Sequence, residues 1–197
     1  MRALVTALLP PVLLALMVWL ADGVNHLLAH TLAELFSIVV AITALVVAST
    51  SRHFTRNHYF VFVSVAIGWC AGLDLLHMVT YKGLHLVATN SANMPTQFWI
   101  AARLLQAVAM ATAPIMLSRH IPSEWLHALF GTASLVMVLA IFTGHFPEAY
   151  IDGQGLTPFK VYSEYLVVVL LGLSLLFMWH RRALTTQRMR AGASVLL

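Results

Sequence analysis

The segment LDLLHMVTYKG at residues 73–83, followed after a polar loop by NMPTQFWIAAR at residues 93–103, decides how this chain folds. Both segments belong to strongly apolar runs, yet they carry an acid, an imidazole and a guanidinium at Asp74, His77 and Arg103. Ionisable groups inside apolar spans are costly, and they usually mark a function. These residues are therefore the first candidate site.

The rest of the chain is apolar as well, since 60% of its 197 residues are hydrophobic and only 9% are charged. A membrane-spanning helix needs about 20 mainly apolar residues. Runs that meet this requirement lie at about 3–21, 28–49, 59–79, 97–117, 125–143 and 162–179. We therefore expect an all-α fold, a polytopic membrane bundle of six transmembrane helices, with residues 1–197 forming a single integral-membrane domain.

Prolines and glycines predict where this bundle is irregular. Pro10 and Pro11 should kink the first helix or mark a restart, because proline cannot donate a backbone hydrogen bond. Pro114 should bend the far end of the fourth helix. The segment 144–160 contains several glycines and prolines and should be an irregular loop.

Lysine and arginine fall unevenly on the two sides of the predicted membrane. One side has only Lys82 and Lys160, and the other has Arg2, Arg52, Arg56, Arg119, Arg181, Arg182, Arg188 and Arg190. By the positive-inside rule both termini of this multi-pass protein are expected to be cytoplasmic. Topology thus explains the net charge of +4, and no nucleic-acid partner is expected.

The basic tail, about residues 181–197, follows the last span. Its helix-forming residues could extend that span toward a cytoplasmic output module. Alternatively, the tail anchors the chain to acidic membrane lipids, at about 1 kcal/mol per basic residue.

The polar residues within the spans gather on one side of the membrane. Glu34, Asp74, His77 and Arg103 are expected within about 10 Å of the outer boundary, from a rise of about 1.5 Å per residue. His30 and Glu34 are four residues apart and share a helix face. A pocket open to the outside would use such a cluster. Two alternatives remain: polar contacts that only fix helix register, and an ion path, which the apolar inner halves disfavour.

Two kinds of ligand suit this pocket. His30 and His77 could bind a transition metal or ligate haem iron. A cage of Tyr81, Asn93, Trp99 and Arg103 could instead bind a small or lipophilic organic molecule from the outer leaflet. The single cysteine, Cys70, excludes a disulfide framework or a multi-thiolate metal site within one chain.

Three motifs, AELFSIVV at residues 33–40, GLDLLHMVTYKG at 72–83 and NMPTQFWIAAR at 93–103, give the chain a family resemblance. It resembles the bacterial membrane-associated sensor family of the third type, over nearly its whole length. The resemblance implies an N-terminal input domain in a bacterial inner membrane, joined to a histidine kinase or diguanylate cyclase, often through a PAS domain. The family's motif residues fall on Glu34, Asp74, His77, Lys82, Asn93, Gln97, Trp99 and Arg103.

These observations predict a sensory input domain without catalytic activity of its own. It would bind a ligand near the periplasmic face, signal through its last helix to an output module in the same chain, and act as a homodimer among membrane lipids. The predicted ligand-binding residues are Glu34, Asp74, His77, Tyr81, Lys82, Asn93, Gln97, Trp99 and Arg103. The alternatives are a small membrane oxidoreductase with haem or metal on His30 and His77, and a transporter, for which matching broken helices are not evident.

Overall fold

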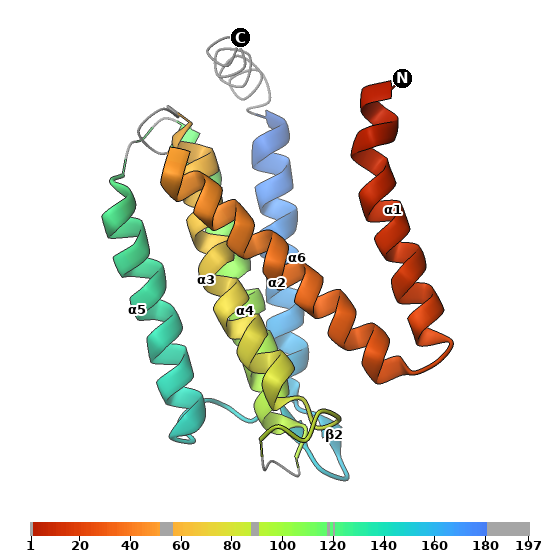
Figure 1. Ribbon diagram of the computed structural model, residues 1–197. Helices are drawn as coiled ribbons and strands as arrows, with labels where there is room; N and C mark the ends of the chain where they lie inside the picture. The colour runs from red at the N-terminus through yellow and green to blue at the C-terminus, as the bar shows by residue number, and fades with distance from the viewer. Residues whose placement is uncertain (1, 52–56, 88–90, 118, 120, 181–197) are drawn as a thin grey trace.

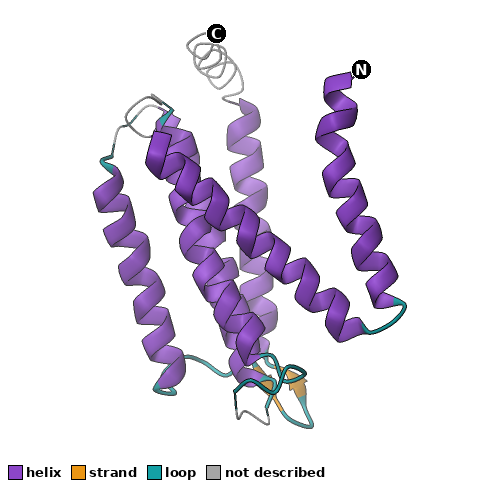
Figure 2. Ribbon diagram, viewed as in Figure 1, coloured by secondary structure: helices purple, strands orange, loops and turns teal. Residues whose placement is uncertain are grey.

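The computed structural model describes residues 2–51, 57–87, 91–117, 119 and 121–180. Within them the chain is mainly helical, and the predicted all-α membrane bundle is confirmed (Figures 1 and 2). The six α-helices are α1 (Arg2–Asp22), α2 (His26–Ser51), α3 (His58–Thr80), α4 (Asn93–Thr112), α5 (Ser123–Phe142) and α6 (Pro158–His180). A 3₁₀ turn, η1 (Ala113–Leu117), continues α4 at Pro114, where the sequence predicts a bend.

Five of these helices, α2 to α6, are long and apolar enough to cross a membrane, counting only residues that the structure describes. In α1 the apolar segment within these described residues is Pro11–Asp22, which is too short to cross a membrane. The helix itself continues through Pro10 and Pro11 as one element, so of the two predicted alternatives, a kink or a restart, the restart does not occur. The start of α1 and the end of α6 lie at the same end of the bundle (Figure 1).

Helices α3 and α4 form the centre of the bundle. Helices α2 and α5 pack against α3, α6 packs against α4, and α1 packs mainly against α2. The central interface is built from small side chains, including the fully buried Ala66, Ala101 and Ala102, around the fully buried Phe98. Small residues let membrane helices approach closely. The surrounding helices leave many apolar side chains exposed, as lipid contact requires.

Polar side chains fix where several helices begin. Asn25 Oδ1 accepts a hydrogen bond from the backbone N–H of Leu27 at the start of α2. Asn57 does the same for the first turn of α3, and Thr157 for α6. Such caps satisfy amides that lack a partner in the first helical turn.

Three segments differ from their sequence-based prediction. Helix α6 begins at Pro158, four residues earlier than expected, because proline fits the first position of a helix. Helix α4 begins at Asn93, four residues earlier than expected, because proline is tolerated in a first turn and Pro95 therefore does not delay the helix. The predicted irregular loop after α5 contains a short antiparallel hairpin of β1 (Tyr150–Ile151) and β2 (Gly155–Leu156). Gly153 in its turn and Gly155 at the start of β2 have positive φ angles, which glycine adopts without strain.

Some sequence predictions lie outside the described residues. These are the tail 181–197 with its four arginines, and the basic positions Arg52 and Arg56 between α2 and α3.

Candidate functional site

The polar cluster begins between α2 and α3, where a glutamate meets two histidines. His30 and Glu34 lie one turn apart on α2, and His77 lies near the end of α3. Glu34 Oε1 is 2.9 Å from His77 Nε2 and 3.4 Å from His30 Nε2. The three side chains are 27% (His30), 18% (Glu34) and 9% (His77) exposed. We call these three residues the histidine–glutamate triad.

The other ring nitrogen of His77 ties α3 to α4. His77 Nδ1 lies 2.7 Å from the backbone oxygen of Pro95. A carbonyl oxygen only accepts hydrogen bonds, so Nδ1 carries the proton and donates it to Pro95. The ring is thereby held with Nε2 directed at Glu34.

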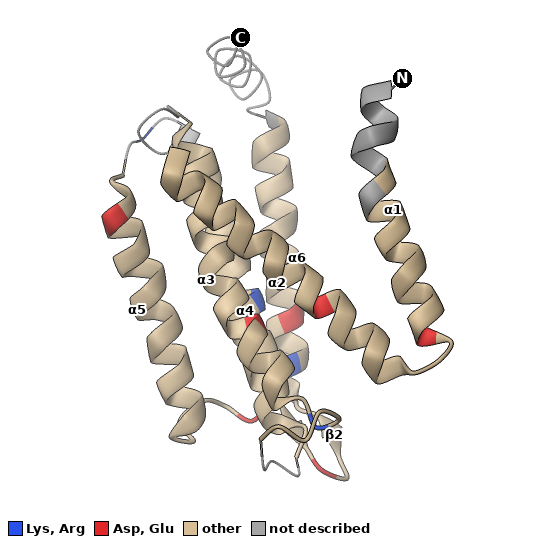
Figure 3. Cartoon of the chain, viewed as in Figure 1, with Lys and Arg blue, Asp and Glu red and all other residues tan. Residues whose placement is uncertain are grey.

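An ion pair links α3 and α4 on the same side of the bundle. Arg103 Nη2 donates to both carboxylate oxygens of Asp74, at 2.6 Å and 2.5 Å. The two side chains are 27% and 23% exposed, so water screens them only partly. Opposite charges that meet in an apolar span lower each other's cost of burial. In Figure 3 the charged positions of α2, α3, α4 and α6 fall within the same half of the bundle.

A cation over an aromatic ring connects α4 with α6. Lys160 Nζ lies 4.7 Å from the centre of the Trp99 ring and also bonds Glu164 Oε1 at 2.5 Å. Only 12% of the Lys160 side chain is exposed. Partial desolvation strengthens attraction between a cation and the face of an indole ring.

The first turn of α4 holds the loop that contains the hairpin. Asn93 Oδ1 accepts hydrogen bonds from the backbone N–H groups of Ala149 and Tyr150, at 2.9 Å and 3.0 Å. Gln97 Nε2 donates to the carbonyls of Phe146 and Pro147. Both amide side chains thus fix loop backbone.

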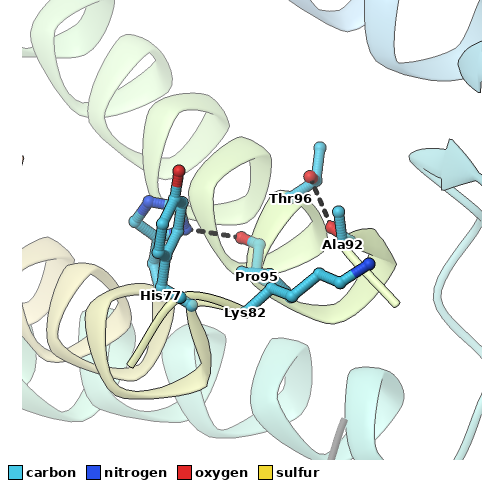
Figure 4. A pocket seen from close by; sticks show the side chains of 7 residues that line it. His77, Lys82, Ala92, Pro95 and Thr96 are labelled. Atoms are coloured by element: carbon cyan, nitrogen blue, oxygen red, sulfur yellow. Dashed lines mark hydrogen bonds between the residues drawn. The ribbon is translucent and has the colours of Figure 1, made fainter. Parts of the chain in front are cut away.

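A cavity of about 330 Å³ lies beside the triad, where the loop after α3 meets the start of α4. Its lining residues are His77, Tyr81, Lys82, Gly83, Ala92, Pro95 and Thr96. In Figure 4 the Lys82 side chain extends past Pro95 toward Ala92, and His77 stands at the other end of the group. The volume is within the range of small-molecule sites, which run from about 300 to 1,000 Å³.

Comparison with known proteins identifies the family. The family model described as a membrane-associated sensor domain, MASE3, matches residues 21–195. The chain belongs to the MASE3 family. The match begins at the end of α1, so it covers α2 to α6 and every candidate residue. No curated protein and no solved structure matches the chain.

The MASE3 domain brings only part of the predicted site together. Of the predicted ligand-binding residues, His77, Tyr81 and Lys82 line the cavity. Glu34 contacts His77 from α2, and Asp74 pairs with Arg103.

The residues of the predicted aromatic cage contact different elements of the MASE3 domain. Tyr81 packs on the His30 ring with centroids 4.5 Å apart, whereas Arg103 contacts Asp74. Trp99 faces α6 and Asn93 holds the loop after α5. Direct ligand contact by Asn93, Gln97, Trp99 and Arg103 remains a prediction.

Several contacts in the MASE3 domain are not predicted from the sequence. The sequence places Lys160 in a loop, although its spacing of four from Glu164 is typical of a helical ion pair. The carbonyl of Pro95 had no signal in the sequence, because a backbone group is selected by packing alone.

Proposed function

We propose that this MASE3 domain binds a small ligand in the cavity beside His77 and passes the signal through α6 to an output module. One observation carries the proposal: His77 forms part of the cavity wall and contacts both neighbouring helices. Its two nitrogens lie 2.9 Å from Glu34 on α2 and 2.7 Å from Pro95 on α4. A ligand that displaces this ring would therefore disturb both helix interfaces.

The lining of the cavity favours a small ligand with an acceptor group and an apolar part. Lys82 supplies an ammonium group, Tyr81 an aromatic ring, and Gly83, Ala92 and Pro95 apolar surface. Such a mixture is typical of sites where few polar groups orient a mainly apolar molecule. The loop position of Lys82 suits entry from the periplasmic side, which the asymmetry of arginine and lysine assigns to this end.

A series of contacts supports transmission from the cavity to α6. Helix α3 contacts α4 through the pair Asp74 and Arg103, and α4 contacts α6 through Trp99 and Lys160. From that contact α6 runs to the end of the bundle where α1 begins (Figure 1). Coupling of about 1 to 3 kcal/mol between the cavity and this helix would be enough to switch an output.

The remaining parts of the proposal follow from sequence. We expect α1 to be a sixth span, both termini to be cytoplasmic and the inner membrane to be the location. The expected partner is a histidine kinase or diguanylate cyclase module in the same chain, working as a homodimer. The domain 1–197 would then be the input of a longer signalling protein.

A haem oxidoreductase is less well supported by the geometry of the triad. A haem between His30 and His77 needs a flat gap between the two imidazoles. Glu34 Oε1 lies within 3.4 Å of both Nε2 atoms and occupies that gap.

The test measures the output activity of the full-length parent protein in membranes. It compares wild type with variants in which a residue of the cavity wall is replaced. We expect Tyr81→Ala and Lys82→Ala to abolish the response to stimulus while the protein stays in the membrane. His85→Ala is the matched control, because His85 lies in the same loop but does not line the cavity. A normal response from both cavity variants would refute the proposal.

A further inference from the structure

Three metal-ligating side chains converge between α2 and α3. The structure places one potential ligand atom from each of His30, Glu34 and His77 within 4.8 Å of the other two. We infer that this triad binds one divalent transition-metal ion of the zinc or iron(II) class. The inference goes beyond the proposed function, because it rests on donor geometry and holds whether or not the domain signals.

The donor set selects the class of ion. Two imidazole nitrogens and one carboxylate oxygen suit zinc and iron(II), whereas magnesium and calcium prefer oxygen ligands alone. Three protein ligands also leave a coordination position for water or another small ligand. His77 and Tyr81, which contacts His30, both line the neighbouring cavity.

The three side chains are held close to the arrangement that an ion requires. Ligands of a tetrahedral ion at about 2.1 Å are roughly 3.4 Å apart. Two spacings from Glu34 Oε1, 2.9 Å to His77 and 3.4 Å to His30, are similar. The ligand atoms of the two histidines lie within 4.8 Å of each other, so an ion would draw them closer together.

A second set of contacts orients the ligands. His77 donates from Nδ1 to the Pro95 carbonyl, which leaves the Nε2 lone pair toward Glu34. Metal-bound histidines usually donate their other nitrogen to a carbonyl or carboxylate in this way. The His30 ring packs against Tyr81, with centroids 4.5 Å apart. Each imidazole is thus held by a contact outside the triad.

Unpartnered atoms indicate that a cation belongs here. Within the described part of the chain, Glu34 Oε2 and His30 Nε2 are buried without a hydrogen bond. The distance of 3.4 Å between His30 Nε2 and Glu34 Oε1 is short enough for an ion pair, but the two atoms do not form a hydrogen bond. An unsatisfied buried polar group costs about 1 to 3 kcal/mol. Pairing of a charged His77 with Glu34 leaves His30 unexplained, whereas an ion uses all three residues.

The test is a Co²⁺ titration of the full chain, purified in detergent and stripped with a chelator. Cobalt reports its own coordination through visible absorption, and Zn²⁺ displaces it from sites of this type. We expect one Co²⁺ per chain, released by Zn²⁺. His30→Ala, Glu34→Gln and His77→Ala should each weaken binding by at least about 100-fold, because even loss of an orienting contact costs about 10- to 100-fold.

Two exposed histidines provide matched controls. His85 and His145 lie in loops at the same end of the bundle, outside the triad, and their replacement by Ala should leave the Co²⁺ affinity unchanged. Glu34→Gln keeps the size of the side chain, and each variant is checked for helical content and a single elution peak.

The outcomes separate this inference from the proposed function. Absence of stoichiometric Co²⁺ binding, or equal affinity in wild type and Glu34→Gln, overturns the metal site and leaves the cavity proposal standing. Binding that depends on all three residues supports the site even if Tyr81→Ala and Lys82→Ala signal normally, a result that refutes only the sensory proposal.

Discussion

Glu34 Oε1 lies 2.9 Å from His77 Nε2 and joins α2 to α3 within segments that are otherwise almost entirely apolar. Other polar contacts link neighbouring helices at this end of the bundle. Among them, Asp74 and Arg103 join α3 to α4, and Trp99 and Lys160 join α4 to α6. Removal of one partner from a contact of this kind should have a measurable effect on stability.

Loss of Arg103 should destabilise the bundle, because Asp74 would be left unpaired in a largely apolar setting. We expect Arg103→Ala to lower the free energy of unfolding by about 3 kcal/mol, the low end for a buried pair, since both side chains are partly exposed. The double variant Asp74→Asn, Arg103→Ala should recover part of this loss. Unfolding in detergent, monitored by circular dichroism, gives both values.

The control for this pair is Asp22→Ala, whose carboxylate bonds the exposed His26. Surface pairs contribute at most about 1 kcal/mol, so little change is expected. Additive effects of the two substitutions in the double variant would show that Asp74 and Arg103 do not stabilise one another.

Two glycines on α3, one turn apart, should respond in opposite ways to the same substitution. A Cβ at Gly68 would lie 2.7 Å from Leu45 Cβ on α2, so Gly68→Ala should destabilise the α2–α3 interface by about 1 to 3 kcal/mol. A Cβ at Gly72 meets nothing within 4 Å, and Gly72→Ala should be neutral or stabilising by up to about 1 kcal/mol. Thermal unfolding of the two variants tests the predicted order, and equal midpoints would contradict it.

Removal of the Asn93 side chain should release the loop after α5. Asn93→Ala leaves the amides of Ala149 and Tyr150 without their acceptor, so their hydrogen exchange should accelerate by about tenfold, equivalent to about 1.4 kcal/mol. Asn93→Asp keeps an acceptor oxygen and serves as the control. The exchange rate is measured by mass spectrometry of peptides from residues 146–157. Equal exchange in Asn93→Ala and wild type would show that the Asn93 side chain does not hold this loop.

Replacement of Lys160 should loosen α6 at one end. Lys160→Met removes the charge above the Trp99 ring and should cost about 1 kcal/mol of stability. Lys160→Arg keeps a cation there and should restore most of the loss. The measurement is the unfolding midpoint of the two variants. Identical midpoints for Lys160→Met and Lys160→Arg would show that the contact with Trp99 does not stabilise the protein.

Labelling of introduced cysteines tests the expected orientation in the membrane. The native Cys70 is buried, at 3% exposure, and should not react with a membrane-impermeant maleimide. A cysteine at His85 should be labelled in intact spheroplasts, and one at Arg119 only after the membrane is opened. The reverse pattern would place the termini outside.

Hydropathy predicted the helices well because a membrane demands long apolar segments, and the ionisable residues within those segments predicted where the polar cluster lies. The pairing of Glu34 with His77 was harder to foresee. It depends on the angle at which α2 crosses α3, which close packing at Gly68 helps to set.

Other contacts are made by backbone groups, which every residue has, so no residue type in the sequence predicts them. The carbonyl that accepts from His77 and the amides held by Asn93 are of this kind. The hairpin within 150–156 is short, with two residues in each strand, so its strands give no alternating pattern that sequence analysis could detect.

Two polar contacts join α6 to α4 at different positions along the helix axis. One is Lys160 on Trp99, and the other is Ser174 Oγ, which donates to the Met110 carbonyl at 2.7 Å. Fourteen residues of helix separate the two points, a length of about 21 Å. If the first contact opens while the second holds, α6 becomes a lever that turns about Ser174, and a small shift at one membrane surface becomes a swing at the other.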